Sequence, residues 1–366
     1  MMRPMGCVVF IQGRPHRAGA QTCLARLLGH ERLKALNPVL VSGGRGWLTE
    51  ECERLGVPVL VRRFPGSRSL WSRFIGNALF AREVAQGIAS MGMRPAIVHA
   101  NDHIEGLLAL GIARAAGAKS AVFLRSPRMT RRDYFKYGCG HFDLVAPVCD
   151  LMKEKADAWD GKKASRLIYD TIRADEFGPA RDKPATFPMR LLVVGSAEER
   201  KGWADFTEAL YMLSQKAPLP PLELDFTGIM PDPAENDLKL GRLRGVKCRF
   251  LGRVEGFRWL VLGYDLVVNP SRDECFATAA LEVVAAGVPI LTSTAGQVGR
   301  LPLPGHMFFR PGDPADLARA LGRLMTGWDG LDMDVSACQA EIARNFSLDR
   351  SVDGLIRAYE GLDRVA

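Results

Sequence analysis

Short apolar segments that end in small or polar residues recur along the chain, and amphipathic stretches separate them. In the first half these segments lie at 8–11, 38–41, 57–61, 96–99, 120–124 and 144–147. The pattern starts again later, with segments at 190–195, 222–228, 248–252, 266–270 and 289–292. Short strands alternating with helices are typical of a parallel sheet covered on both faces. The sequence therefore predicts an α/β fold.

Residues 175–189 separate the two series of segments. This stretch contains Gly178, Pro179, Pro184 and Pro188 and has little periodicity, as expected of an interdomain linker. A chain of 366 residues is also too long for one ordinary core. We therefore expect two Rossmann-like domains with parallel sheets facing across a cleft, residues 1–178 and 179–349.

Composition points to a soluble cytoplasmic protein. No stretch approaches the ~20 apolar residues of a membrane-spanning helix, and the apolar run at 7–11 is too short for a signal peptide. None of the eight cysteines forms a C-x-x-C pair, which favours buried reduced thiols over a metal site or a disulfide framework.

Positive charge is concentrated in the first domain. Residues 1–178 contain 27 Lys and Arg against 16 Asp and Glu, a net +11, so the remainder of the +8 chain carries −3. Such a basic half indicates an anionic partner, and nucleic acid, anionic lipid and phosphorylated glycan are all compatible with it.

Three segments of the second half suit a sugar nucleotide. Residues 195–202 place Arg200 and Lys201, two cations suited to a diphosphate, between a strand and a helix. Residues 270–282 place Glu274 in a loop and Glu282 inside the following helix, so that both carboxylates can accept hydrogen bonds from vicinal hydroxyls. Residues 285–296 end in Ala295-Gly296, where backbone can approach a phosphate closely and where another helix is expected to begin. Each segment alone is also compatible with an ordinary solvated surface.

The order of these motifs resembles the retaining glycosyltransferases of family 4, which have the GT-B fold. The motifs are Lys201-Gly202, Phe250-Leu251-Gly252, Asn269-Pro270-Ser271, Glu274 to Glu282, Ala285 to Pro289 and Pro311 to Pro314. The resemblance runs from about Val8 to Tyr359 and is nearest to the bacterial envelope and lipopolysaccharide-core sugar transferases.

The resemblance implies a role for each matching residue. Arg200 and Lys201 would hold the diphosphate and stabilise the charge left as the glycosidic bond breaks. Glu274 would contact the donor sugar and Glu282 the ribose. The other implied donor-binding residues are Gly195, Ser196, Phe276, Ala277, Thr278 and, from the first domain, Gly19. The last helix, 350–366, would pack back on the first domain.

The implied reaction is retaining transfer from a nucleotide-diphosphate sugar, with a UDP-hexose as the default donor and GDP-mannose as its main rival. It would require no metal and no cofactor, and no Asp-x-Asp lies at a strand-end loop. On the acceptor side, Asp102 and His103 follow a first-domain strand, while His16 lies in the first loop. Arg125 occupies the place where the family often has a histidine. Each of the two histidines is equally compatible with a structural role.

Basic stretches carrying Trp, Tyr and Phe, at 62–74 and 125–137, predict attachment to the anionic inner-membrane surface. The expected acceptor is a lipid-linked or phosphorylated glycan. An epimerase acting on a UDP-sugar and a donor-binding protein without transfer activity remain alternatives. A nucleic-acid-binding protein rests on charge alone, and the first loop lacks the G-x-G-x-x-G of a nicotinamide dehydrogenase.

Overall fold

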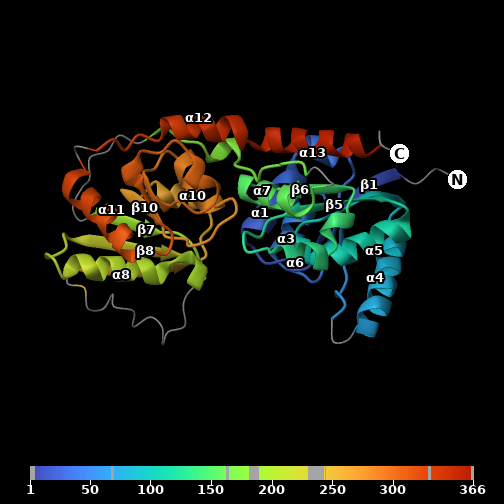
Figure 1. Cartoon of the computed structure of the whole chain (residues 1–366). Helices are drawn as coiled ribbons and strands as arrows, with labels where there is room; N and C mark the ends of the chain where they lie inside the picture. The colour runs from blue at the N-terminus through green and yellow to red at the C-terminus, as the bar shows by residue number, and fades with distance from the viewer. Residues whose placement is uncertain are drawn as a thin grey trace. The chain divides into compact units, whose positions relative to one another are not determined.

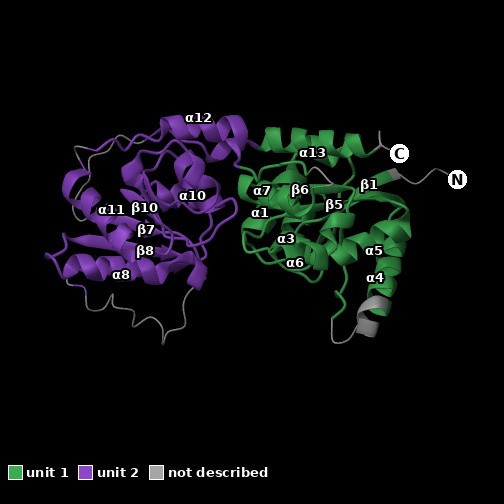
Figure 2. Cartoon of the chain, viewed as in Figure 1, with its two compact units in different colours: residues 1–171, 348–366 green, residues 172–347 purple. Residues whose placement is uncertain are grey.

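The computed structural model describes residues 5–66, 70–161, 165–180, 189–229, 243, 245–328 and 331–363. The chain divides into two compact units (Figure 2). Unit 1 comprises residues 1–171 and 348–366, and unit 2 comprises residues 172–347. The division thus falls a few residues before the expected boundary of 178, and residues 181–188 of the expected linker lie outside the described residues.

Unit 1 is built on a six-stranded parallel sheet of order β3-β2-β1-β4-β5-β6. Strands β1, β5 and β6 of this sheet are labelled in Figure 1. Its strands are β1 (Met5–Gln12), β2 (Val39–Ser42), β3 (Val59–Val61), β4 (Met93–Ala100), β5 (Lys119–Leu124) and β6 (Leu144–Pro147). The described residues of β2 and β6 are buried throughout. Strands without a polar face are expected where helices cover both sides of a parallel sheet.

Helices of unit 1 pack against one another and on the sheet. Helices α4 (Leu70–Ser90) and α5 (Gly106–Ala116) contact each other and β4, whereas α1 (Gly19–Gly29) contacts α2 (Glu31–Lys34) and α3 (Trp47–Arg54). The C-terminal helix α13 (Leu348–Asp363) packs against α1, α2 and β6. The remaining α-helices of the unit are α6 (Arg131–Lys136) and α7 (Asp150–Trp159).

Unit 2 repeats the same topology, with the order β12-β11-β10-β7-β8-β9. Its strands are β7 (Met189–Val193), β8 (Leu222–Thr227), β9 (Val246–Gly252), β10 (Leu266–Asn269), β11 (Ile290–Ser293) and β12 (Phe308–Phe309). Its α-helices are α8 (Trp203–Ser214), α9 (Phe257–Val261), α10 (Thr278–Ala285), α11 (Pro314–Gly327) and α12 (Ser336–Asn345). The expectation of two Rossmann-like α/β units with parallel sheets is confirmed.

The core of unit 2 lies between the sheet and helices α8 and α11. Leu191, Phe206, Phe226 and Leu321 are fully buried there, and the Trp203 and Phe226 rings lie 4.7 Å apart. This packing fixes the start of α8, and with it the position of the residues that directly precede the helix.

Candidate active site

In unit 2 the strand order reverses between β7 and β10, which pair directly. Ligands of open parallel sheets bind at such a switch point, outside the carboxyl ends of the strands. The loops that leave β7 and β10 there are residues 195–202 and 270–277, which we call the two switch-point loops. They carry most of the donor-binding residues predicted from the sequence.

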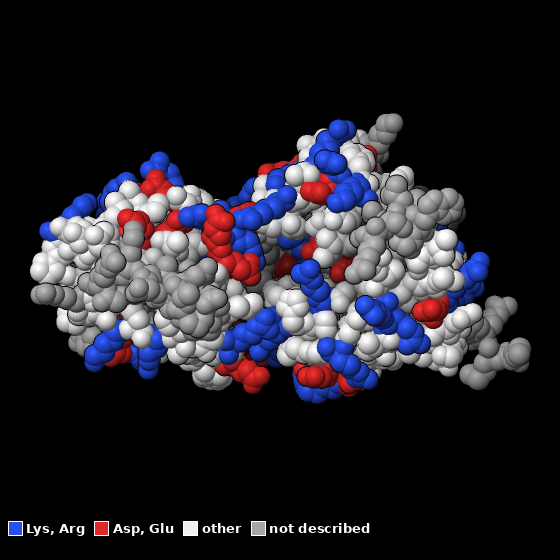
Figure 3. All heavy atoms as spheres, turned by 90° about the horizontal axis from the view of Figure 1, so that it is seen from below, with Lys and Arg blue, Asp and Glu red and all other residues white. Residues whose placement is uncertain are grey.

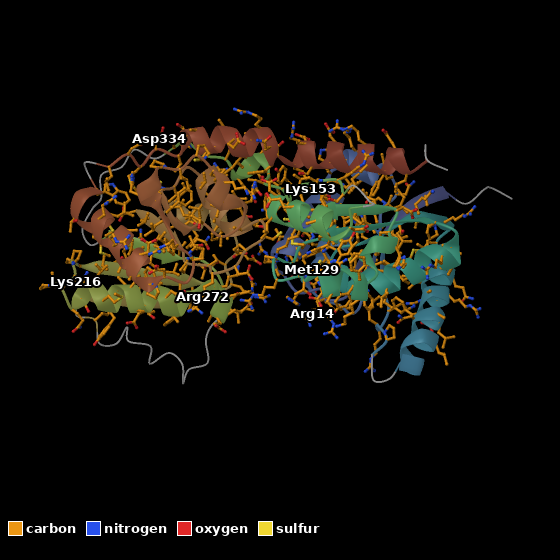
Figure 4. All side chains as sticks on the ribbon, in the orientation of Figure 1. Arg14, Met129, Lys153, Lys216, Arg272 and Asp334 are labelled. Atoms are coloured by element: carbon orange, nitrogen blue, oxygen red, sulfur yellow. The ribbon has the colours of Figure 1, made fainter. Side chains whose placement is uncertain are left out.

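The two switch-point loops are in close contact. Gly202 has φ of +69°, and a Cβ there would lie 1.9 Å from the Pro270 carbonyl oxygen, so glycine is required. The Arg272 amide donates to the Arg200 carbonyl at 2.8 Å. The Arg272 guanidinium also binds both carboxylate oxygens of the buried Asp205 in α8, at 2.6 and 2.7 Å (Arg272 is labelled in Figure 4). These contacts hold the cations of one loop beside the carboxylate of the other.

Lys201, Arg200 and Glu274 form one charged cluster. Lys201 Nζ pairs with Glu274 Oε1, and Arg200 Nη1 lies 3.9 Å from Glu274 Oε2. The side chains of Lys201 and Glu274 are 19% and 12% exposed, whereas that of Arg200 is 33% exposed. Partial burial strengthens charge interactions relative to open solvent. Two cations and a carboxylate are thus available to bind phosphate oxygens and sugar hydroxyls.

A buried hydrogen-bond network lies next to Glu274. The Ser271 hydroxyl lies 3.0 Å from Glu274 Oε1, and the Ser293 hydroxyl donates to the Ser271 carbonyl at 2.5 Å. Asn269 Nδ2 donates to Thr292 Oγ1 at 3.0 Å, which links the ends of β10 and β11. Ser271 Oγ also lies 3.0 Å from Asn269 Oδ1, so the Glu274 carboxylate is oriented by a loop residue that the ends of β10 and β11 hold in place.

The second switch-point loop ends at a strained residue. Ala277 caps the N-terminus of α10 with φ of +61°, in the left-handed region that residues other than glycine seldom adopt. Phe276 and Ala277 are buried and Thr278 is the first residue of α10. Glu282 lies about one turn further along α10 and is half-buried. Backbone amides at the start of this helix favour a negatively charged ligand.

The first switch-point loop begins with Gly195 and Ser196. Gly195 lies against the Lys201 side chain, and Ser196 Oγ accepts a hydrogen bond from the Ile229 amide at 3.2 Å. The structure therefore brings together Gly195, Ser196, Arg200, Lys201 and Glu274 at one edge of the sheet of unit 2, with residues 276–282 directly following in the chain.

The candidates of unit 1 are placed on loops at the carboxyl ends of its strands. Gly19 is exposed at the first position of α1, and His16 is exposed in the preceding loop. Asp102 caps a short 3-10 helix by accepting from the His103 amide at 2.6 Å, and it also pairs with His103 Nδ1. His103 is buried and its ring packs on Tyr137, so this histidine also has a structural partner.

Arg125 is buried in unit 1 and its charge is compensated there. Its guanidinium pairs with the buried Asp170, and its Nε donates to the Asn101 carbonyl at 2.9 Å. The Arg125 side chain also lies 4.6 Å over the Phe123 ring. Sequence reasoning did not indicate this environment, because Asp170 is 45 residues away in the chain.

Glu105 is a polar residue that the sequence did not single out. It is 4% exposed, and its Oε1 accepts a hydrogen bond from the Gly13 amide at 3.0 Å. The pKa of Glu105 is raised to about 8, chiefly by burial and then by the nearby Asp102, while the Gly13 amide and Arg14 oppose the shift. The available signal was a carboxyl group two residues after His103, but its burial could not be inferred from that position.

The described residues include neither a metal-binding cluster nor a membrane-spanning helix. No group of three or more His, Cys, Asp and Glu side chains there is placed to hold a metal ion. Over the same residues, no helix combines the length and the apolar character needed to cross a bilayer.

Comparisons with known proteins identify the kind of domain that carries these loops. Residues 188–327, which contain both switch-point loops, match the protein-family model described as Glycosyl transferases group 1. Residues 188–327 are a glycosyltransferase group 1 domain. Over 256 residues the chain is 26% identical to a glycogen synthase of Mycobacterium tuberculosis, covering 62% of this chain and 59% of that protein. The chain thus spans less than two thirds of that relative's length.

A shorter match and two solved structures extend the comparison. A D-inositol 3-phosphate glycosyltransferase of Salinispora arenicola is 37% identical over 103 residues, 26% of this chain and 21% of that protein. The structure of HepE from Anabaena in complex with UDP and glucose has a TM-score of 0.77 at 16% identity, covering 96% of this chain and 99% of HepE. The lipopolysaccharide outer core galactosyltransferase WaaB has a TM-score of 0.68 at 17% identity, covering 98% and 99%. The fold of the chain is GT-B.

The glycosyltransferase domain therefore carries the clustered cations and carboxylate. Lys201 and Glu274, which the sequence placed 73 residues apart, meet at its switch point. Unit 1 lies outside residues 188–327, the range that the family model matches. Its sheet nevertheless has the same topology as that of the glycosyltransferase domain.

Proposed function

We propose that the chain transfers a hexose from a UDP-hexose to a glycan or glycolipid acceptor of the bacterial envelope, with retention of anomeric configuration. The observation that carries the proposal is the contact of Lys201 and Arg200 with Glu274 at the switch point of a glycosyltransferase domain. A diphosphate beside two cations and a sugar beside a carboxylate would fill such a site.

Each residue of the site has a distinct part in the proposed reaction. Arg200 and Lys201 bind the diphosphate and stabilise the negative charge that grows on it as the bond to the sugar breaks. Glu274 binds the sugar hydroxyls, and Glu282 binds the ribose hydroxyls. The start of α10 adds backbone dipoles directed at the same charge. This set supplies charge compensation from the protein itself, so the proposed mechanism includes no metal and no other cofactor.

The donor and the acceptor are proposed on separate grounds. UDP is supported by HepE, whose structure contains UDP, and a hexose is supported by WaaB, which is a galactosyltransferase. A lipopolysaccharide or related glycan is supported by WaaB and by the excess of positive charge in unit 1. Figure 3 shows Lys and Arg on one face of unit 1, with Asp and Glu between them.

We further propose that unit 1 binds the membrane through exposed side chains of α4 and α6. Ile75 and Leu79 lie one turn apart on α4 and are 55% and 54% exposed. On α6, Arg131, Arg132 and Lys136 are exposed together with Phe135. Exposed apolar side chains beside cations suit an anionic membrane surface. The predicted basic stretch 62–74 falls partly on residues 67–69, outside the described residues.

A product assay tests the proposed function. Purified protein is incubated with UDP-glucose, UDP-galactose or GDP-mannose and with lipopolysaccharide core oligosaccharides, with and without EDTA. We expect acceptor-dependent release of UDP, a product with the anomeric configuration of the donor, and equal rates in EDTA. Conversion of the UDP-sugar without an acceptor would instead identify an epimerase, and inhibition by EDTA would contradict the metal-free mechanism.

A further inference from the structure

Unit 1 has a switch point of its own, between the paired strands β1 and β4. Buried polar side chains gather there: Gln12 at the end of β1 hydrogen-bonds Asn101, which directly follows β4. Polar groups buried at this place are unexpected in a purely structural loop, because each must be hydrogen-bonded to offset its desolvation.

Glu105 is the buried carboxyl group of this switch point. Its Oε1 accepts from the Gly13 amide at 3.0 Å, whereas its Oε2 is buried and has no hydrogen-bond partner. Glu105 directly precedes α5, yet its side chain does not cap that helix. The carboxyl group therefore serves the loop that follows β1 and not its own helix.

The loop held by Glu105 comprises residues 13–18 and joins β1 to α1. Its first residue is tightly enclosed: a Cβ on Gly43 would lie 2.3 Å from the Gly13 carbonyl oxygen, and Phe64 lies against Gly13 from another side. Further along, Arg14 and His16 are exposed (Arg14 is labelled in Figure 4). The loop is thus fixed at one end and presents cationic and titratable groups at the place where parallel sheets bind ligands.

We propose that Glu105 is a positioning residue for the transfer reaction, which through the Gly13 amide holds the loop 13–18 in the conformation that receives the acceptor. This inference rests on the proposed function for the reaction, but the Glu105–Gly13 contact itself does not depend on it.

Ionisation of Glu105 provides the means to test this role. The pKa of Glu105 is raised to about 8 by burial first and by the nearby Asp102 second, while Arg14 and the amides of Gly13 and Glu105 oppose the shift. The neutral carboxyl group therefore dominates below about pH 8. Above it, the Gly13 amide donates to a stronger acceptor, but Oε2 is a buried anionic oxygen without a hydrogen-bond partner, and we expect the loop to move so that water reaches this oxygen. Loop conformation and turnover should both change over this pH range.

The experiment uses the full chain labelled with ¹⁵N-glycine, as wild type, Glu105→Gln and Asp102→Asn. The Gly13 amide resonance and the rate of UDP-glucose consumption are followed between about pH 6 and pH 10. In the wild type, the Gly13 resonance and the rate of UDP-glucose consumption should both show a transition near pH 8, and turnover should be several-fold lower above this pH. Glu105→Gln should lack the transition, and Asp102→Asn should shift it to lower pH because a like charge is removed.

The outcomes separate this role from the proposed function. An unchanged pH transition in Glu105→Gln, or a Gly13 resonance that does not respond to pH, overturns the positioning role. If Glu105→Gln does not fold, the direction of the shift in Asp102→Asn decides. If the protein binds neither UDP-glucose nor UDP-galactose, the proposed function fails, while the Gly13 resonance still reports whether Glu105 holds the loop.

Discussion

Glu105 shows how a single buried carboxyl group makes stability depend on pH. Its pKa is raised from 4.5 to about 8, so between these values the folded chain keeps a proton that the unfolded chain releases. Below about pH 4.5 the ionisation of Glu105 does not lower the free energy of unfolding. As pH rises, the free energy of unfolding decreases by up to about 1.4 kcal/mol per pH unit, until the folded carboxyl group ionises near pH 8.

Glu105→Gln should remove this dependence. We expect the variant to unfold at about the same urea concentration as wild type near pH 4.5, and to become progressively more stable than wild type up to about pH 8. Urea denaturation followed by circular dichroism at several pH values measures the difference. A constant difference between the two proteins across this range would show that Glu105 ionises normally in the folded state.

Ala277 is a residue whose backbone strain can be measured directly. Because its φ is +61°, Ala277→Gly should relieve steric strain and raise the free energy of unfolding by about 1 kcal/mol. The matched control is Ala279→Gly inside α10, which should lower it by about 1 kcal/mol. Thermal unfolding of both variants tests the pair, and destabilisation of equal size in each would contradict a left-handed Ala277.

At the scale of elements, the two switch-point loops depend on one ion pair. Arg272 binds Asp205 of α8 through two hydrogen bonds, and its amide binds the carbonyl of Arg200. Asp205→Asn should reduce stability by about 1–2 kcal/mol, since Arg272 is partly exposed, and should also weaken UDP binding because Arg200 loses its position. Arg319→Ala, on the exposed face of α11, is the control. Unchanged UDP affinity in Asp205→Asn would contradict this coupling.

Much of the element order could be predicted from the sequence, because buried parallel strands are short apolar runs that end in glycine or polar residues. The helix expected after residues 195–202 and the helix expected after the loop that carries Glu274 are both confirmed, as α8 and α10. The helix expected after Ala295-Gly296 is instead a short 3-10 segment, Gln297–Arg300. Local pattern does not distinguish one turn of helix from several.

The pairing of distant polar groups could not be predicted. Arg125 with Asp170, Arg272 with Asp205 and Glu105 with Gly13 each join segments that come together only in the folded chain. Lys201 and Glu274 were assigned to one site through their motifs, but their direct contact depends on the adjacency of β7 and β10. Strand order, and hence adjacency, is not encoded in any single segment.

For the whole molecule, the uneven charge of the chain leads to a prediction about membranes. Vesicles containing anionic phospholipid should sediment the protein, and Ile75→Ser with Leu79→Ser should reduce the bound fraction several-fold because exposed apolar area is lost. Trp259→Ser, which removes a 71% exposed side chain from unit 2, is the matched control. Equal sedimentation with neutral vesicles would contradict a role for charge in membrane binding. An equal loss of binding in Trp259→Ser would contradict binding through α4.

In the proposed reaction, Arg200 and Lys201 of unit 2 bind the pyrophosphate of the donor. Calorimetric titration of the purified chain with UDP tests it most directly, with Lys216→Ala as a control because Lys216 is an exposed cation just beyond α8 (Figure 4). We predict saturable binding by wild type and Lys216→Ala, and affinity lower by about 100-fold in the double variant Arg200→Ala with Lys201→Ala. Absence of binding by wild type, or equal affinity in the double variant, would contradict the account.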